Sequence, residues 1–287
     1  MRVMSKITAS AAGTITLGDM TVNRMGYGAM RLTGRGIWGE PRDPEEARRV
    51  LRRALELDVN FIDTADSYGP RVSERLIREA LWPYPADLVI ATKGGLLRDG
   101  PDQWRPDGRP SHLRIALEGS LERLGLERID LYQFHRPDPA VPYEESVGEL
   151  VRLKDEGKIR HLGLSNVDPE QLDKALAMTE IVSVQNRYNL ADRSSEAVLD
   201  KCNSLGIAFL PWFPLAASQL TREEHRVEEV ASEHRATPGQ LALAWLLARS
   251  PVVLPIPGTS SVEHLEENIA AASIELSRSD VDLLAAA

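Results

Sequence analysis

Residues 129–165 read IDLYQFHRPDPAVPYEESVGELVRLKDEGKIRHLGLS, and this stretch decides the fold. Two short apolar runs, 129–135 and 159–165, enclose a longer segment whose apolar residues have helical spacing. Parallel strands need a crossover connection of this length, usually a helix, whereas antiparallel strands can be joined by a tight turn. The stretch therefore predicts a strand–helix–strand unit in an α/β protein.

The same alternation runs from residue 22 to residue 272. Further strand-like runs begin at Val22, Asn60, Asp87, Glu180, Gly206 and Pro251, and helical patterns separate them. Eight strand-then-helix units predict a (β/α)8 TIM barrel, with a doubly wound sheet as the alternative. The run TITLGDMTV (14–22), turning at Gly18-Asp19, predicts an N-terminal β-hairpin that plugs the barrel. We expect residues 1–12 to be a flexible extension and residues 13–287 to form a single barrel domain.

Composition narrows the class of protein. The 34 Lys and Arg against 43 Asp and Glu give a net charge of -9, which argues against a nucleic-acid partner. The single cysteine, Cys202, excludes an intramolecular disulfide and fits a reducing compartment. The N-terminal residues lack the apolar region of a signal peptide, and the apolar run from Leu241 is far too short to span a membrane. We expect a cytoplasmic protein without a membrane-bound part.

Polar side chains stand where three consecutive predicted strands end: Asp63, then Tyr68 in the loop that follows it, Lys93, and His135. Taken singly, each can be structural: an Asp can cap a turn, a Tyr can be half-buried, and a Lys at the end of a strand can be solvated. Together they form a catalytic set, because the loops at these strand ends carry the chemistry of a barrel. A phenol is a poor acid at neutral pH, and Lys93 can stabilise its phenolate while Asp63 keeps Lys93 charged. His135 supplies a second donor, so the set suits protonation of a carbonyl oxygen while another group delivers hydride to the carbonyl carbon.

These residues lie in motifs that resemble the aldo-keto reductase superfamily. The motifs are FIDTADSYG (61–69), ATK (91–93), DLYQFH (130–135), GLSN (163–166), VQNRYN (184–189) and IPGTSSVEHLEEN (256–268), in the family's order. The resemblance implies that Tyr68 is the general acid, that Asp63, Lys93 and His135 complete a tetrad, and that a nicotinamide cofactor supplies hydride. It also implies that Ser165, Asn166 and Gln185 hold the carboxamide and that Trp212 stacks on the nicotinamide.

The segment 258–261 follows the predicted eighth strand and opens a helix. Backbone N–H groups, hydroxyls and the helix dipole gather there, as they do where barrels bind phosphate, although an ordinary N-cap is the alternative. With Gly258 opening this segment, the resemblance assigns adenosine-phosphate or adenine binding to Thr259, Ser260, His264, Glu267 and Asn268. Many relatives have Lys and Arg where this chain has Gly258 and His264, and NADPH (NADP+) is nonetheless the expected cofactor.

We expect a small-molecule carbonyl substrate in a comparatively open pocket lined by Tyr27, Trp38, Trp104 and Phe213. The stretches RMGYGAMRL (24–32) and PWFPL (211–215) resemble the bacterial branch of the family that includes pyridoxal reductases, which implies reduction of pyridoxal to pyridoxine. We expect a monomer or weak oligomer.

Other interpretations of the sequence remain. The literal G-x-G-x-x-G at 34–39 is followed by EPRDP rather than a helix, so it does not predict a dinucleotide-binding turn. No histidine spacing suggests a metal site, and none is expected. Alternative functions are a Schiff-base aldolase using Lys93 and a cofactor-bound regulatory barrel without significant turnover.

Overall fold

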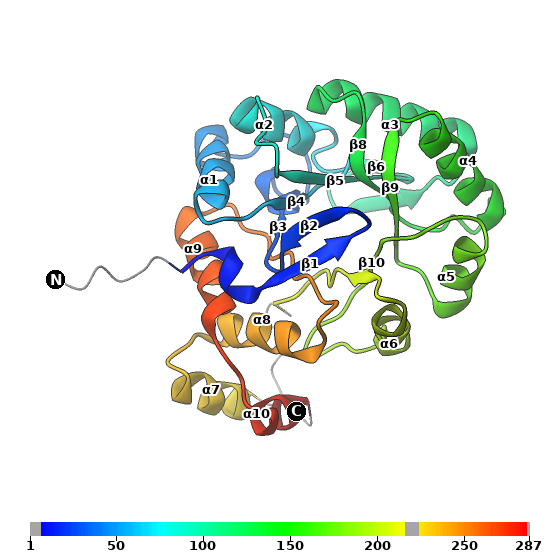
Figure 1. Ribbon diagram of the computed structural model, residues 1–287. Helices are drawn as coiled ribbons and strands as arrows, with labels where there is room; N and C mark the ends of the chain where they lie inside the picture. Colours follow the sequence, from blue (N-terminus) through cyan, green and yellow to red (C-terminus); the bar gives the residue numbers. More distant parts are fainter. Residues whose placement is uncertain (1–6, 216–223, 286–287) are drawn as a thin grey trace.

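The computed structural model of the chain describes residues 7–215 and 224–285, and it contains one central parallel sheet (Figure 1). Neighbouring strands follow the order β11-β10-β9-β8-β5-β4-β3, so neighbours in space are also consecutive parallel strands in sequence. This order is that of a barrel wall rather than of a doubly wound sheet. The strands are β3 (Tyr27–Gly28), β4 (Phe61–Asp63), β5 (Val89–Gly94), β8 (Ile129–Phe134), β9 (Ile159–Ser165), β10 (Ser183–Gln185) and β11 (Ala208–Phe209).

The segment 252–257 closes the sheet between its two edges. On one side the N–H of Phe209 donates to the carbonyl of Val252 at 2.8 Å, and on the other the N–H of Gly26 donates to the carbonyl of Pro255 at 2.9 Å. Prolines at 251, 255 and 257 have no N–H to give, so the segment bridges both edges without forming a regular ladder. The eighth predicted strand is therefore an irregular one, and the (β/α)8 barrel is confirmed.

The predicted N-terminal hairpin is present as β1 (Thr14–Leu17) and β2 (Met20–Asn23). Its apolar side chains Leu17, Met20 and Val22 pack with inward-facing strand residues such as Leu131 and Leu254. The hairpin thus closes one end of the barrel, and it lies across the front of the sheet in Figure 1. This confirms the predicted plug.

The structure differs from the sequence prediction in two further segments. The strand expected from Val22 is divided between β2 and β3, because the chain turns from the plug into the wall around Arg24, whose guanidinium donates to the carbonyls of Leu247, Ser250 and Val253. A second hairpin, β6 (Leu96–Gly100) and β7 (Gln103–Pro106), was not predicted.

Part of the expected flexible extension packs on the barrel. Residues 1–6 lie outside the described part of the chain, but Ala9–Ala12 form the 3-10 helix η1. Ala9 is fully buried, and its N–H donates to the carbonyl of Leu57 at 2.8 Å.

Helices surround the sheet, and their sequence signals are visible at their first turns. Asp43 caps α1 by accepting from the N–H groups of Glu45 and Glu46, and capping boxes open α5 and α8. The helices are α1 (Pro44–Glu56), α2 (Val72–Leu81), α3 (Pro110–Leu124), α4 (Tyr143–Asp155), α5 (Pro169–Leu176), α6 (Glu196–Leu205), α7 (Glu224–Glu233), α8 (Pro238–Arg249), α9 (Val262–Ala270) and α10 (Arg278–Ala285). None of these described helices is long and apolar enough to cross a membrane.

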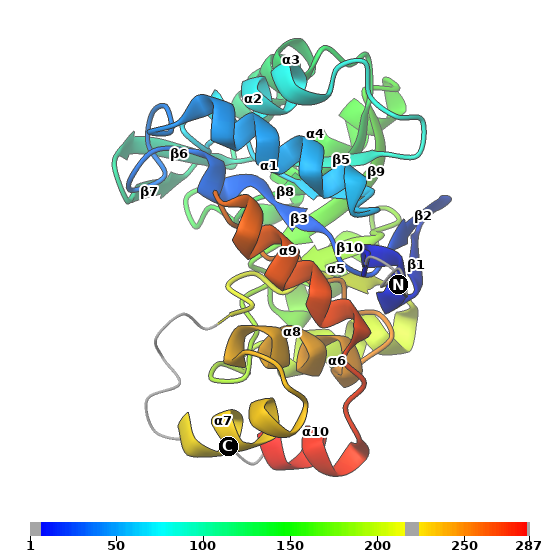
Figure 2. The same cartoon turned by 90° about the vertical axis from the view of Figure 1, so that its left-hand side faces the viewer.

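The two hairpins mark opposite ends of the barrel. In Figure 2 the plug β1–β2 lies on the right and the β6–β7 hairpin on the left. The strands run from the plugged end towards the β6–β7 end, so their carboxyl ends open there. Barrel chemistry is expected at that open end.

Candidate active site

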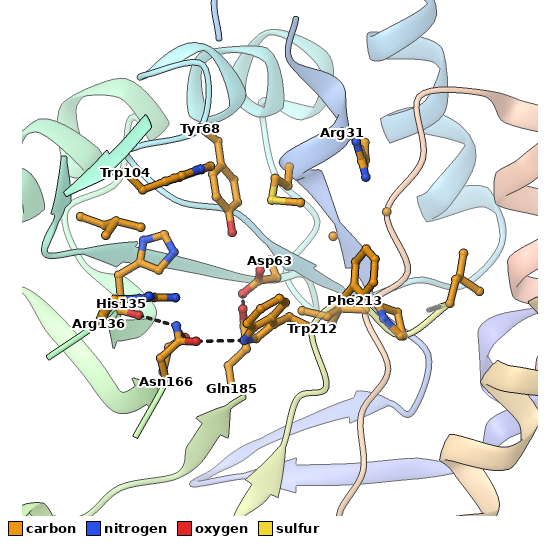
Figure 3. Close-up of a pocket in the computed structure, with 18 residues that line it drawn as sticks. Arg31, Asp63, Tyr68, Trp104, His135, Arg136, Asn166, Gln185, Trp212 and Phe213 are labelled. Atoms are coloured by element: carbon orange, nitrogen blue, oxygen red, sulfur yellow. Dashed lines mark hydrogen bonds between the residues drawn. The ribbon is translucent and has the colours of Figure 1, made fainter. Parts of the chain in front are cut away.

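A pocket lies at the carboxyl ends of the strands, and most of the candidate residues line it (Figure 3). Its wall consists of Gly28, Met30, Arg31, Asp63, Tyr68, Leu96, Trp104, His135, Arg136, Ser165, Asn166, Gln185, Trp212, Phe213, Pro214, Leu215, Ile256 and Gly258. The pocket therefore joins the predicted tetrad to the predicted cofactor segment in one continuous space.

Lys93 lies directly behind this wall, at 0% exposure, and its ammonium is held by three oxygens. Its Nζ donates to Asp63 Oδ2 at 2.6 Å, to the Thr64 carbonyl at 2.8 Å and to the Tyr68 hydroxyl at 3.3 Å. Burial alone acts to lower the pKa of Lys93, but the charge of Asp63, the interaction with Tyr68 and the hydrogen bonds to both residues together raise that pKa. Lys93 is therefore a fixed cation beside the phenol.

The second oxygen of Asp63 is also fully engaged. Its Oδ1 accepts from Gln133 Nε2 at 2.9 Å and from Gln185 Nε2 at 2.8 Å, so three donors, one of them a cation, hold one carboxylate in place. Gln133 was missed by the sequence analysis. A signal existed, because Gln133 stands two residues before His135 in the predicted strand run 129–135, and side chains two residues apart in a strand face the same side.

The Tyr68 side chain is buried and points its hydroxyl into the pocket (Figure 3). Burial raises the pKa of its phenol, and the charge of Lys93 opposes that rise. The phenol is thus protonated at neutral pH and has a cation ready to stabilise its phenolate. Its ring meets Trp104 and His135 edge-on, with centroid distances of 6.4 and 5.9 Å.

His135 is present as a neutral imidazole. Burial, followed by the charges of Lys93 and Arg136, lowers its pKa well below the usual value. Its Nδ1 lies 3.4 Å from Ser67 Oγ. A neutral ring beside Tyr68 can offer one N–H to a developing oxyanion while remaining uncharged.

The residues expected to hold the carboxamide meet at one side of the pocket. Asn166 adopts a left-handed backbone, with φ of 58°, and its amide donates to the His135 carbonyl and to Ser165 Oγ, both at 3.0 Å. Its Oδ1 accepts from Trp212 Nε1 at 3.1 Å, which orients the indole. Figure 3 shows Asn166 below His135, with Gln185 and Trp212 on its right.

At the predicted phosphate segment, Gly258 lines the pocket and the residues after it form a helix cap. A Cβ at Gly258 would lie 2.7 Å from the Gly28 carbonyl, so only glycine allows the two backbones this close. Ser261 Oγ accepts from the N–H of His264, and Glu46 Oε1 accepts from the N–H of Val262 at 3.2 Å. Side chains of the protein itself therefore accept hydrogen bonds from two of the N–H groups at the start of α9.

The remaining candidates lie outside the pocket wall. Tyr27 is fully buried and donates its hydroxyl to the Thr259 carbonyl at 2.6 Å, which ties β3 to the 258–261 segment. Trp38 lies 37% exposed beside Arg98, with the Arg98 guanidinium 5.8 Å from its ring. Glu267 accepts from the Thr237 hydroxyl at the cap of α8, Asn268 is buried on α9, and Ser260 is exposed.

Two arginines of the pocket wall were also missed by the sequence analysis, namely Arg31 and Arg136. They lie on opposite sides of the pocket in Figure 3, with Arg136 beside His135. Arg31 lies close to Gly258, because its Cγ would be 3.6 Å from a Cβ at that glycine. Over residues 7–215 and 224–285, no carboxylate lies within ion-pair distance of either guanidinium. Arg31 lies within the quoted stretch 24–32, on the 3-10 helix η2 (Ala29–Leu32), and Arg136 directly follows His135, but neither position shows from the sequence alone that its side chain faces the pocket.

No cluster of three or more His, Cys, Asp and Glu residues suited to a metal occurs in the described part of the chain.

The barrel and the pocket define a class of enzyme in which loops at strand ends surround a buried Lys–Asp pair and a phenol. The Aldo/keto reductase family model matches residues 24–287, and the chain belongs to that family and is an oxidoreductase. It is 53% identical to an uncharacterized oxidoreductase, C215.11c, of Schizosaccharomyces pombe, over 95% of this chain and 89% of that protein. It is 46% identical to pyridoxine 4-dehydrogenase of Escherichia coli, over 93% of this chain and 95% of that enzyme.

A solved structure shows the same fold. The aldo-keto reductase of Klebsiella pneumoniae in complex with NADPH superposes with a TM-score of 0.78 at 28% identity, covering 94% of this chain and 93% of that one. The resemblance inferred from the motifs is therefore confirmed at the level of the family.

Proposed function

We propose that the protein reduces aldehydes and ketones to alcohols with NADPH, and that Tyr68 is the proton donor. The observation that carries the proposal is the 3.3 Å contact between Lys93 Nζ and the Tyr68 hydroxyl, with Lys93 itself fixed by Asp63. As the carbonyl oxygen gains charge, the phenol gives up its proton, and Lys93 stabilises the phenolate that remains. His135 donates to the same oxygen and keeps it oriented.

The pocket fits a nicotinamide cofactor. Gly28 and Gly258 form a narrow backbone cradle that a Cβ would fill, and the pocket extends from there to Tyr68. The cofactor, when bound, supplies the hydride. Ser165, Asn166 and Gln185 would hold its carboxamide, and Trp212, oriented by Asn166, would cover one face of its ring.

NADPH is preferred in this proposal because the pocket offers a cation near the cradle. Cγ of Arg31 would lie 3.6 Å from a Cβ at Gly258, so the Arg31 side chain passes beside the start of the 258–261 segment. We assign Arg31 to a phosphate of the cofactor, in place of the positive charge that Gly258 and His264 do not provide. Thr259, Ser260, His264, Glu267 and Asn268 are assigned to the adenosine end. The known binding of NADPH by the Klebsiella pneumoniae enzyme supports the choice.

The same contacts argue against a Schiff-base aldolase. A nucleophilic lysine must be able to lose its proton, whereas Asp63 raises the pKa of Lys93. Reduction with borohydride in the presence of an aldehyde is therefore expected to leave Lys93 unmodified, and a trapped adduct on Lys93 would support the aldolase instead.

Pyridoxal is the proposed substrate, among a broad range of small carbonyl compounds. The Escherichia coli relative is a pyridoxine 4-dehydrogenase, and Trp104, Trp212 and Phe213 give the pocket aromatic walls. Stacking on such a wall is worth about 0.5–1.5 kcal/mol beyond burial, or roughly tenfold over an aliphatic aldehyde of equal size.

We propose that the enzyme is cytoplasmic, which the free and buried Cys202 supports. We also propose that it is a monomer or weak oligomer, because a single chain lines the complete pocket.

The test is kcat/KM for pyridoxal, 4-nitrobenzaldehyde and butanal, each with NADPH and with NADH. We expect turnover of all three with NADPH, with pyridoxal ahead of butanal and NADPH binding more tightly than NADH. Equal values for pyridoxal and butanal would refute the pyridoxal assignment alone, and no turnover with any carbonyl would refute the reductase.

A further inference from the structure

The β6–β7 hairpin carries an arginine, Arg98, whose guanidinium donates all of its hydrogen bonds to groups of the protein. Arg98 on β6 stands directly across from Trp104 on β7 in the antiparallel register. Its Cζ lies 3.6 Å from the Trp104 ring centroid, so the guanidinium stacks on the indole. Trp104 in turn meets the ring of Tyr68 edge-on at 6.4 Å.

The same guanidinium donates to five backbone carbonyls. Two belong to its own hairpin, Gly100 and Gln103, both at 3.1 Å. Three belong to other segments: Gly36 at 2.7 Å, Ile37 at 2.6 Å and Ser67 at 3.3 Å. Arg98 therefore joins the hairpin, the 34–39 loop and the residue that precedes Tyr68.

The 34–39 loop needs such a restraint. Ile37 is a β-branched residue in the left-handed region, with φ of 55°, which is costly for this residue type. Its carbonyl is fixed by Arg98 and by the N–H of Gly69 at 3.3 Å. Without the guanidinium, the hairpin would lose its hydrogen bond to the Ser67 carbonyl and its side-chain hydrogen bonds to the 34–39 loop. The bond from the Gly39 N–H to the Gly69 carbonyl at 2.6 Å would still join that loop to the Tyr68 loop.

We propose that Arg98 is the positioning residue that fixes the Trp104 wall of the pocket relative to Tyr68, and thereby sets the affinity for aromatic carbonyl substrates. The proposal rests on the assignment of Tyr68 as the proton donor. Arg98 touches none of the reacting atoms and acts through Trp104. Only arginine fits, because its planar fork presents five N–H donors and a face that stacks on an indole, and lysine offers neither.

The first experiment measures kcat and KM for 4-nitrobenzaldehyde at saturating NADPH in Arg98→Lys, Arg98→Met, Trp104→Ala and the Arg98→Lys/Trp104→Ala double variant. Arg105→Met is the matched control, because Arg105 lies on the same hairpin and, within residues 7–215 and 224–285, its guanidinium pairs with the exposed Asp99 alone. We expect KM to rise about tenfold or more in both Arg98 variants, with a smaller change in kcat, since a displaced wall weakens substrate positioning. The double variant should match Trp104→Ala within about twofold.

The second experiment follows hydrogen exchange in the same proteins and does not depend on turnover. Arg98→Lys should speed exchange in residues 34–39, 66–69 and 96–106 together, whereas Arg105→Met should affect only its own hairpin. Any of three results would overturn the proposal. They are a normal KM in Arg98→Lys, a KM in the double variant that shows the product of the two single effects, and unchanged hydrogen exchange in residues 34–39. If no carbonyl is reduced by the wild type, the proposed function fails, and the exchange result still decides the role of Arg98.

Discussion

Breaking the Lys93–Asp63 pair should destabilise the protein far more than breaking an exposed pair. Asp63→Asn leaves the ammonium of Lys93 at 0% exposure with neutral oxygens as its only partners, because the amide that replaces the carboxylate carries no charge. An uncompensated buried charge of this kind costs about 3–5 kcal/mol. For a chain of 287 residues the unfolding entropy is about 0.6 kcal/mol per kelvin, so Tm should fall by roughly 5–8 °C.

The converse variant, Lys93→Met, leaves Asp63 with its two glutamine donors and should cost a similar amount. The double variant Asp63→Asn/Lys93→Met removes both charges and should cost no more than either single change. The coupling energy between the two sites is then about 3 kcal/mol or more.

The assay is urea unfolding at pH 7.5, followed by circular dichroism, with the m-value compared among variants. The control is the exposed pair Arg105–Asp99, where Asp99→Asn should cost less than about 1 kcal/mol. Additive effects of Asp63→Asn and Lys93→Met would refute the reasoning, because they would show that the two groups are not a charged pair in the folded protein.

Three further outcomes follow from individual contacts. Burial and then the charge of Glu74 raise the pKa of Asp66 to about 8, so the folded state holds a proton that the unfolded state loses. The stability that this proton contributes is therefore lost as pH rises from about 4 to about 8. The Tm of Asp66→Asn should rise relative to that of the wild type over this pH range, and a Tm difference that does not change with pH would contradict it. Arg31→Met should weaken NADPH binding about tenfold, measured by fluorescence titration, and raised salt should reduce the wild-type advantage; an unchanged Kd would remove Arg31 from the cofactor site. Gly258→Ala should weaken binding of both NADPH and NADH, because its methyl group would meet the Gly28 carbonyl; normal binding would show that the cradle is not used.

Local signals in the sequence were enough to predict most of the fold. Asp43-Pro44 marks the start of α1, and Gly18-Asp19 marks the turn of the plug, because caps and tight turns depend on neighbouring residues. The division of the run from Val22 between β2 and β3 could not be predicted in this way. It depends on carbonyls of residues more than 200 positions away that receive the Arg24 side chain.

The site residues that stand at strand ends were predictable, because the carboxyl ends of all strands meet at one end of a barrel. That rule places Asp63, Lys93 and His135 at one end of the barrel from the sequence alone. It could not place Tyr27, whose hydroxyl turns away from the pocket to the Thr259 carbonyl, nor Trp38, which lies beside Arg98. Such placements depend on side-chain direction and on loop contacts, which neither periodicity nor motif spacing contains.

The central claim is that Tyr68 protonates the carbonyl oxygen while the bound cofactor delivers hydride. The most direct measurement is a single-turnover reaction of pyridoxal with NADPH deuterated at the transferable position of C4, in the wild type and in Tyr68→Phe. The wild type should place deuterium on the carbinol carbon of the product, and Tyr68→Phe should bind NADPH normally but form that product about a hundredfold or more slowly. Deuterated product formed by Tyr68→Phe at a rate near that of the wild type would contradict the account.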